Sequence, residues 1–240
     1  METMKENKKQ IMDEKYWEDI FHGFSCAITG SGETLHGCGT QSLLPSVSQI
    51  AEEDSSPFRV LIATLISLRT KDAVTYAASR RLFSVANTPR AMLALSQEQI
   101  ETAIAPAGFF RTKARNILEI SKKLVEEHGG LVPPDKEALV SLPGVGTKTA
   151  NLTLNLGFGI DAICVDCHVH TIANRTGWVS TKNPEQTEKE LEKILPRRFW
   201  IPLNELLVSY GQKICTSVSP RCSICPIAST CPCIGVKKSR

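Results

Sequence analysis

The sequence has few aromatic residues, no long apolar run and no large excess of charge of either sign. Its 240 residues include 6% aromatic and 22% charged side chains, and the formal net charge is +3. The longest apolar stretch, around residues 60–68, is about half of the roughly 20 residues that a membrane span needs. The N-terminus mixes lysines with acids and lacks the apolar core of a secretory signal. We therefore expect an intracellular protein that is neither secreted nor embedded in a membrane, with one large domain or two small ones.

Cysteine is the residue type that the chain has in excess. Nine cysteines are too many for chance in a protein expected inside the cell, where stable disulfides are rare. Four of them follow the spacing C-x6-C-x2-C-x5-C, namely Cys215, Cys222, Cys225 and Cys231. Thiolates at such spacing bind a tetrahedral zinc ion or an iron–sulfur cluster. Zinc sites usually pair two C-x2-C knuckles, whereas here prolines follow two of the cysteines as in ferredoxin-type runs, so the pattern favours a [4Fe–4S] cluster.

Basic residues are gathered in two places despite the small net charge. The segment from residue 213 to the end has five bases and no acid. A second group has Glu119 as its one acid and consists of Arg111, Lys113, Arg115, Lys122 and Lys123. Such clustering is typical either of an ordinary solvated surface or of a protein with one positive face that meets an anionic partner.

Helical patterns dominate the chain and predict an all-α fold. Ser56-Pro57 opens an apolar segment of helical length, and apolar residues from Ala114 to Val125 recur at i, i+3 and i+4. Residues 148–156 form another predicted helix that ends at a glycine. Residues 23–56 are rich in glycine and serine without a steady period, so we expect a long loop or a partly ordered arm there.

The segment Leu142-Pro143-Gly144-Val145-Gly146-Thr147-Lys148 is predicted to join two helices through a tight turn. Glycines allow positive φ and close approach of another backbone, and the free N–H groups at the start of the next helix can bind a phosphate. The same pattern also occurs in ordinary interhelical loops. It lacks the spacing of a nucleotide-binding P-loop.

Two further residues are candidates for chemistry. Lys148 stands at the start of the second helix, where the positive end of the helix dipole favours the neutral amine that a Schiff base requires. Asp166 is predicted to cap the helix that follows it and could also face a cleft. We expect His168 and His170 to make structural polar contacts, and no serine, histidine and acid constellation indicates a hydrolase triad.

Together these motifs resemble the endonuclease III family of helix-hairpin-helix DNA glycosylases. The similarity rests on LPGVGTKTAN at 142–151, on VDCHVHTIANRTGW around Asp166 and on the terminal cysteine spacing. The resemblance implies two α-helical domains with DNA bound across the cleft between them. One is a six-helix barrel at residues 50–160, and the other joins residues 1–49 to residues 161–240 and holds a [4Fe–4S] cluster.

The resemblance also implies roles for individual residues. Lys148 is expected to attack C1′ of a flipped-out damaged nucleotide, form a Schiff base and nick the strand by β-elimination, with Asp166 assisting. Gly144, Val145 and Gly146 are expected to bind DNA, as are Phe109, at the wedge-loop position, and Arg69. The expected partner is double-stranded DNA with a damaged base or an abasic site, bound by a monomer in the cytoplasm or nucleoid.

Arg69 departs from the family pattern, which usually has glutamine at this position. The sequence therefore leaves three interpretations open. The first is a bifunctional glycosylase and abasic-site lyase that removes oxidised pyrimidines. The second is a lyase specific for abasic sites with altered or lost base excision, and the third is a non-catalytic iron–sulfur DNA-binding protein. The presence of both Lys148 and Asp166 favours an enzyme.

Overall fold

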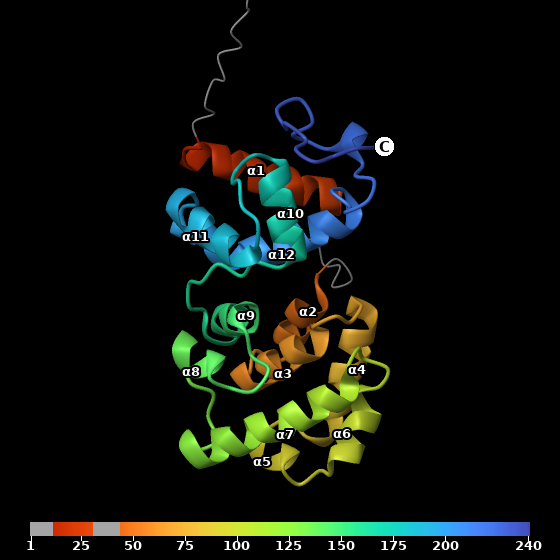
Figure 1. Ribbon diagram of the computed structural model, residues 1–240, viewed down its shortest axis with the longest axis vertical. Coiled ribbons are helices and arrows are strands. Elements are labelled where there is room, and N and C mark those ends of the chain that lie inside the picture. Colours follow the sequence, from red (N-terminus) through yellow and green to blue (C-terminus); the bar gives the residue numbers. More distant parts are fainter. Residues whose placement is uncertain (1–11, 31–43) are drawn as a thin grey trace, which may run out of the picture.

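The computed structural model describes residues 12–30 and 44–240, and it folds into two helical lobes (Figure 1). Within these residues no strand occurs, so the all-α prediction is confirmed. None of the described helices is both long and apolar enough to cross a membrane. The helices are α1 (Glu14–Thr29), α2 (Ser46–Glu53), α3 (Pro57–Ser67), α4 (Asp72–Val85), α5 (Pro89–Met92), α6 (Gln97–Ile104), α7 (Phe110–Glu127), α8 (Lys136–Val140), α9 (Thr147–Phe158), α10 (Cys167–Arg175), α11 (Pro184–Ile194) and α12 (Trp200–Lys213), with short 3₁₀ turns at Arg197–Phe199 and Cys222–Ile224.

Helices α2 to α9 form the lower lobe of Figure 1, which surrounds the apolar helix α3. Every residue of α3 from Val60 to Ile66 is buried. Helix α9 packs closely against α3, because a side chain at Gly157 would lie 2.9 Å from the Cα atom of Pro57. The lobe thus has its own core, which the burial of a continuous apolar helix stabilises.

The upper lobe joins the two ends of the chain. Helix α1 packs against α12, and the rings of Phe24 and Tyr210 are stacked with centroids 3.9 Å apart. Trp17 lies edge-on to Trp178 at 4.9 Å and donates its indole N–H to the carbonyl of Ile194 at 3.1 Å. Aromatic packing of this kind supplies much of the second core, together with the buried face of α12.

The expectation of a loop or arm at residues 23–56 is wrong for most of the described part of that segment. Helix α1 continues to Thr29, and α2 covers Ser46–Glu53. In α1 the buried residues Trp17, Ile20, Phe24 and Ile28 recur at helical spacing, a period that glycine and serine residues obscure. Residues 31–43 lie outside the described part.

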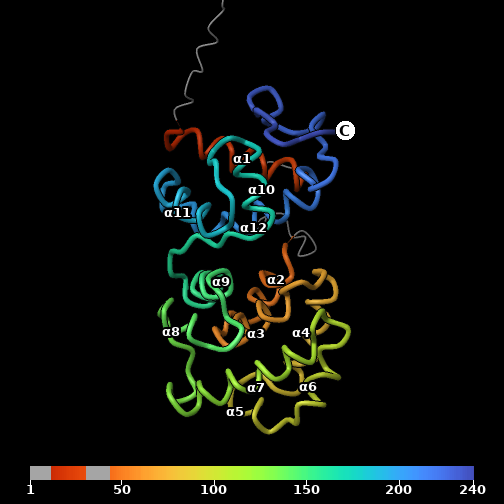
Figure 2. Tube along the Cα trace, viewed as in Figure 1, coloured from red at the N-terminus to blue at the C-terminus, as the bar shows by residue number. Residues whose placement is uncertain are grey.

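The chain passes from the lower to the upper lobe between α9 and α10 (Figure 2). The Cys164 side chain belongs to the lower core, whereas its neighbours Ile163 and Val165 belong to the upper one. Amide groups from both sides hold this crossing, since Asn151 donates to the carbonyl of Ile163 at 2.8 Å and Asn204 to that of Cys164 at 3.2 Å. The crossing therefore sets how α9 and α10 face each other.

Candidate functional site

The predicted turn between two helices is present as the connection between α8 and α9. Gly144 has φ 76°, a left-handed conformation that favours glycine, and a Cβ atom there would lie 2.3 Å from the amide nitrogen of Asn116. Val145 is buried and donates its N–H to the carbonyl of Leu142 at 3.1 Å, so its side chain anchors the turn. Gly146 is the N-cap of α9 and provides no side-chain cap, so the first N–H groups of α9 are available to an external acceptor.

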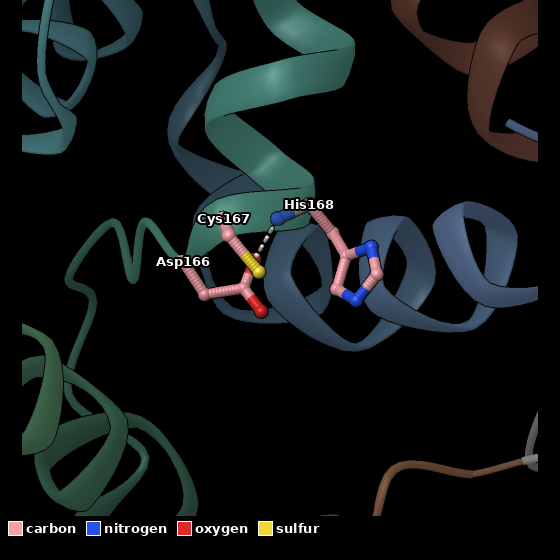
Figure 3. Close-up of side chains that lie close together, drawn as sticks. All are labelled: Asp166, Cys167 and His168. Atoms are coloured by element: carbon pink, nitrogen blue, oxygen red, sulfur yellow. Dashed lines mark hydrogen bonds between the residues drawn. The ribbon is translucent and has the colours of Figure 1, made fainter. Parts of the chain in front are cut away.

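Lys148 lies in the first turn of α9, and Asp166 is the N-cap of α10, as predicted. One carboxylate oxygen of Asp166 accepts the backbone N–H groups of His168 and Val169, both at 2.9 Å. Figure 3 shows the other oxygen pointing away from these bonds, beside the thiol of Cys167. Asp166 can therefore cap α10 with one carboxylate oxygen while the other oxygen faces the adjoining cavity.

Lys148 and Asp166 face the same space between the lobes. Both residues line a cavity that is also bordered by the α3–α4 loop, the start of α2 and the face of α12. They line a second cavity on the other side, together with Gly146 and Glu188. The half-buried lysine and the buried carboxylate thus lie at the boundary of two lobes, where a ligand can reach both.

Two thiols adjoin these residues. Cys164 lies beneath α9, with its Sγ 3.6 Å from the carbonyl of Lys148, and burial raises the pKa of its thiol to about 12. Burial also raises the pKa of Cys167, the neighbouring charge of Asp166 adds to this shift, and Lys148 opposes it. Both thiols are therefore poor nucleophiles.

Asp166, Cys167 and His168 also present ligand atoms within 4.8 Å of one another (Figure 3). The Asp166 carboxylate is already engaged as a cap, and His168 packs against α12, where a Cβ atom at Gly211 would lie 2.5 Å from its Nδ1. His170 contacts the hydroxyl of Thr187 at 2.7 Å. The His170 ring therefore makes a structural polar contact, as expected, whereas the His168 ring packs against α12 and lines the cavity of Lys148.

Arg69 and Phe109 meet although 40 positions separate them in the sequence. The Arg69 guanidinium carbon lies 5.5 Å from the centroid of the Phe109 ring, within cation–π range. Arg69 is exposed and lines the cavity of Lys148 and Asp166, and the Phe109 side chain is 63% exposed. The structure thus brings the exposed aromatic residue and the unusual arginine together at the edge of the cavity.

The sequence predicted that the basic cluster around Lys113 lies on the surface, and for Lys113 itself this prediction is wrong. Lys113 is 5% exposed, and its ammonium group donates to the carbonyls of Ile66 and Leu68 and to the hydroxyl of Thr70. Sequence reasoning missed this role. Its position along the helix could have revealed this role. Lys113 comes directly before Ala114, and both residues lie on the buried, apolar face of α7.

The four predicted cysteine ligands gather around one small cavity in the upper lobe, together with Cys233. The Tyr210 hydroxyl donates to the Cys225 sulfur at 3.0 Å, and an Arg175 N–H lies 3.5 Å from the Cys215 sulfur. Burial raises the pKa values of Cys215 and Cys231, which favours the neutral thiols. A bound cation would favour the thiolate forms instead. These four thiols line the cavity as a set that could hold a metal ion or cluster.

Comparisons with known proteins give one consistent family. A protein-family model described as HhH-GPD superfamily base excision DNA repair protein matches residues 62–197. Endonuclease III of Thermotoga maritima is 46% identical over 179 residues, which cover 75% of this chain and 84% of that protein. Endonuclease III of Escherichia coli K12 is 43% identical over 74% of this chain and 84% of its own length. A solved trapped endonuclease III–DNA covalent intermediate has a TM-score of 0.70 at 34% identity and covers 78% of this chain and 92% of that one.

Proposed function

The chain belongs to the HhH-GPD superfamily of base excision DNA repair proteins, and from this premise we propose how its residues act on DNA. Its relatives and its fold make it a DNA glycosylase and abasic-site lyase of the endonuclease III kind. The proposed substrate is duplex DNA that contains an oxidised pyrimidine or an abasic site. The observation that carries the proposal is that Lys148 and Asp166 line the same cavity between the lobes.

Lys148 is the proposed nucleophile. A flipped-out nucleotide is needed because C1′ and the glycosidic bond are shielded inside stacked DNA. The Lys148 Nζ lone pair forms a bond to C1′ while the glycosidic bond breaks and the base leaves with its electron pair and a proton. Opening of the sugar ring gives a Schiff base. Loss of a C2′ proton then expels the 3′ phosphate, and water releases Lys148 from the unsaturated aldehyde.

Asp166 is proposed to act on the sugar side of this reaction. Its second carboxylate oxygen can stabilise positive charge on the sugar or take the proton that the lysine must lose. The two backbone N–H bonds on its first oxygen hold the carboxylate in one orientation. The helix cap therefore serves the chemistry as well as the fold.

An Asp166→Asn variant separates these two roles, because asparagine caps helices about as well as aspartate but carries no charge. We expect base excision to fall by about a hundredfold or more while thermal stability stays close to that of the parent protein. Single-turnover excision and a thermal melt measure the two effects. Asp166→Ala serves as the matched comparison, with an added stability loss of about 1 kcal/mol. Wild-type excision by Asp166→Asn would reduce Asp166 to a helix cap.

The turn between α8 and α9 is proposed to hold a DNA phosphate through backbone N–H groups of α9. Gly144→Ala and Gly146→Ala test this as a pair. Gly144→Ala should lower the free energy of unfolding by about 2 kcal/mol, because its backbone is left-handed and its Cβ would meet Asn116. Gly146 has φ −100° and open space at its Cβ position, so its alanine variant should fold normally.

For Gly146→Ala we expect affinity for duplex DNA to fall about tenfold, since the added methyl group stands where the phosphate would approach. Fluorescence anisotropy with a labelled abasic duplex measures this, alongside chemical denaturation of both variants. If Gly146→Ala binds DNA as tightly as the parent protein, the turn is only an interhelical loop.

The four cysteines Cys215, Cys222, Cys225 and Cys231 are proposed to hold a [4Fe–4S] cluster. In tetrahedral zinc sites the sulfur atoms lie about 3.8 Å apart. The four cysteines here line one cavity, and their C-x6-C-x2-C-x5-C spacing has a single C-x2-C knuckle, which favours the cluster. When bound, the cluster supplies structural cross-linking of the C-terminal segment. Arg175, through carbonyls of Cys215 and Thr216, ties this segment to α10.

Borohydride trapping on two duplexes tests the function. One duplex carries an abasic site and the other thymine glycol, and a reduced covalent adduct reports the Schiff base. We expect an adduct on both. An adduct on the abasic duplex alone would favour a dedicated lyase, for which the exposed Arg69 at the cavity is the structural reason. Binding without any adduct would contradict the Schiff-base mechanism and leave a DNA-binding protein.

A further inference from the structure

Three donor groups of different chemistry lie together at the start of α10. Asp166, Cys167 and His168 offer a carboxylate oxygen, a thiol sulfur and an imidazole nitrogen, all within 4.8 Å of one another (Figure 3). The same three residues line the cavity that contains Lys148. They lie apart from the four cysteines of the proposed cluster, which line a different cavity in the upper lobe. Carboxylate, thiolate and imidazole are the groups with which proteins bind zinc.

Two of the three donors are held in place by the fold. One oxygen of Asp166 accepts both N–H bonds of the helix cap, each at 2.9 Å, so the second oxygen is left for another partner. The His168 ring packs on the backbone of α12, since a Cβ atom at Gly211 would lie 2.5 Å from its Nδ1. The His170 imidazole, by contrast, is engaged with the Thr187 hydroxyl at 2.7 Å. Donors that are already oriented lower the entropic cost of binding a ligand.

Cys167 supplies the third donor and is the adjustable one. It is the first residue of α10 and is exposed. Zinc bonds of about 2.3 Å to sulfur and about 2.0 Å to nitrogen or oxygen place tetrahedral ligand atoms about 3.5 Å apart. The three donors must therefore approach one another by at most about 1.3 Å. Rotation about χ1 of Cys167 moves its sulfur over this range without moving the backbone.

The charges around these donors select the kind of cation. Lys148 and the positive end of the α10 dipole oppose any cation that is held by electrostatic attraction alone. Mg²⁺ requires oxygen ligands in octahedral geometry, and this group of three offers a single carboxylate. Zn²⁺ forms bonds to thiolate and imidazole, and the two negative charges of the carboxylate and the thiolate neutralise it. The site therefore suits a thiophilic divalent cation and not Mg²⁺.

We propose that Asp166, Cys167 and His168 form an inhibitory binding site for Zn²⁺ in the cavity of Lys148. On binding, the Cys167 thiol releases its proton to solvent, and water takes the fourth tetrahedral position. The bound ion occupies the Asp166 oxygen that the proposed mechanism directs at the sugar, and it adds positive charge where that oxygen would stabilise it. The inference rests on the proposed function, since inhibition requires the reaction of Lys148.

Nicking of an abasic duplex by the purified full chain is measured against Zn²⁺ concentration, with each rate taken relative to that of the same protein without metal. We expect saturating Zn²⁺ to slow the wild type by about a hundredfold, the contribution of a positioned general base. A chelator should restore the rate, and Mg²⁺ at the same concentrations should not change it.

Cys167→Ser removes the thiol donor from an exposed position and should need at least about tenfold more Zn²⁺ for the same inhibition. Even the loss of a group that only supports a metal ligand costs about 10- to 100-fold in metal affinity. Cys26→Ser is the matched control. Cys26 also lies beside an imidazole, with its Sγ 3.5 Å from Nε2 of His22, but it belongs to α1 and does not line the cavity. This variant should be inhibited like the wild type.

Cd²⁺ gives a readout that does not depend on nicking, because a bond between cadmium and a thiolate absorbs in the ultraviolet. The wild type should bind one more equivalent of Cd²⁺ with this absorbance than Cys167→Ser, while the visible absorbance of the proposed cluster stays constant. Equal inhibition of the two proteins, equal Cd²⁺ absorbance, or inhibition only with loss of the visible absorbance overturns the inference. Absence of nicking without metal would instead contradict the proposed function, and the Cd²⁺ titration would still test the site.

Discussion

Lys148→Gln is expected to bind damaged duplex DNA and to lose strand nicking by about a thousandfold or more, since a variant without its nucleophile cannot form the Schiff base. Glutamine keeps the length and polarity of the side chain but has no basic nitrogen. Because Lys148 is half-buried in the first turn of α9 and lines the cavity beside Asp166, the substitution should leave the fold intact. A gel assay of nicking, borohydride trapping and an anisotropy titration measure the three quantities.

Lys193→Gln is the matched control for this result. Lys193 lies in the last turn of α11, pairs with Glu190 on the surface and lines neither cavity. It should nick and trap like the wild type. Nicking by Lys148→Gln at close to the wild-type rate would mean that another group attacks C1′. The thiols of Cys164 and Cys167 are poor substitutes, because burial raises their pKa values.

Cys215→Ser is expected to prevent the proposed [4Fe–4S] cluster from binding. We predict loss of the absorbance near about 400 nm and of bound iron. The free energy of unfolding should fall by about 4 kcal/mol or more, as is usual when a structural metal is lost. Iron analysis, the visible spectrum and a thermal melt are the measurements. The fall in stability follows from the position of Cys215 directly after α12, where it faces the stacked pair Phe24 and Tyr210 across the same cavity.

Cys233→Ser is the control for the cluster. Cys233 lines the same cavity but lies outside the C-x6-C-x2-C-x5-C spacing, so its serine variant should keep iron and colour. Equal loss in both variants would show that the four-cysteine assignment is incorrect. A colourless wild-type protein that contains zinc would contradict the iron–sulfur proposal itself.

Several features of the site were predictable from the sequence because their signals are local. A left-handed turn favours glycine, and Gly144 has that conformation between α8 and α9. An aspartate before a helical pattern predicts an N-cap, and Asp166 receives two backbone N–H bonds. In both cases the residue and its effect lie within about three positions of each other.

Other features depended on contacts between distant segments. The helical period of α1 is clear only when its buried residues are known, because Phe24 packs on Tyr210 from the opposite end of the chain. The basic cluster in α7 was predicted from charge alone, which cannot distinguish an exposed lysine from one that meets carbonyls 45 to 47 positions away.

The sequence by itself determined the all-helical class, the family, and the glycine turn and helix cap that flank the candidate catalytic residues, because each depends on periodicity, spacing or local backbone preference. Only the tertiary structure decided which side chains share a cavity. Lys148 and Asp166 meet there because the chain crosses between two separately packed lobes. Arg69 meets Phe109 because a buried lysine holds two loops together. Such proximity depends on how distant segments pack and on the hydrogen bonds that compensate a buried charge. No single stretch of neighbouring residues encodes these contacts.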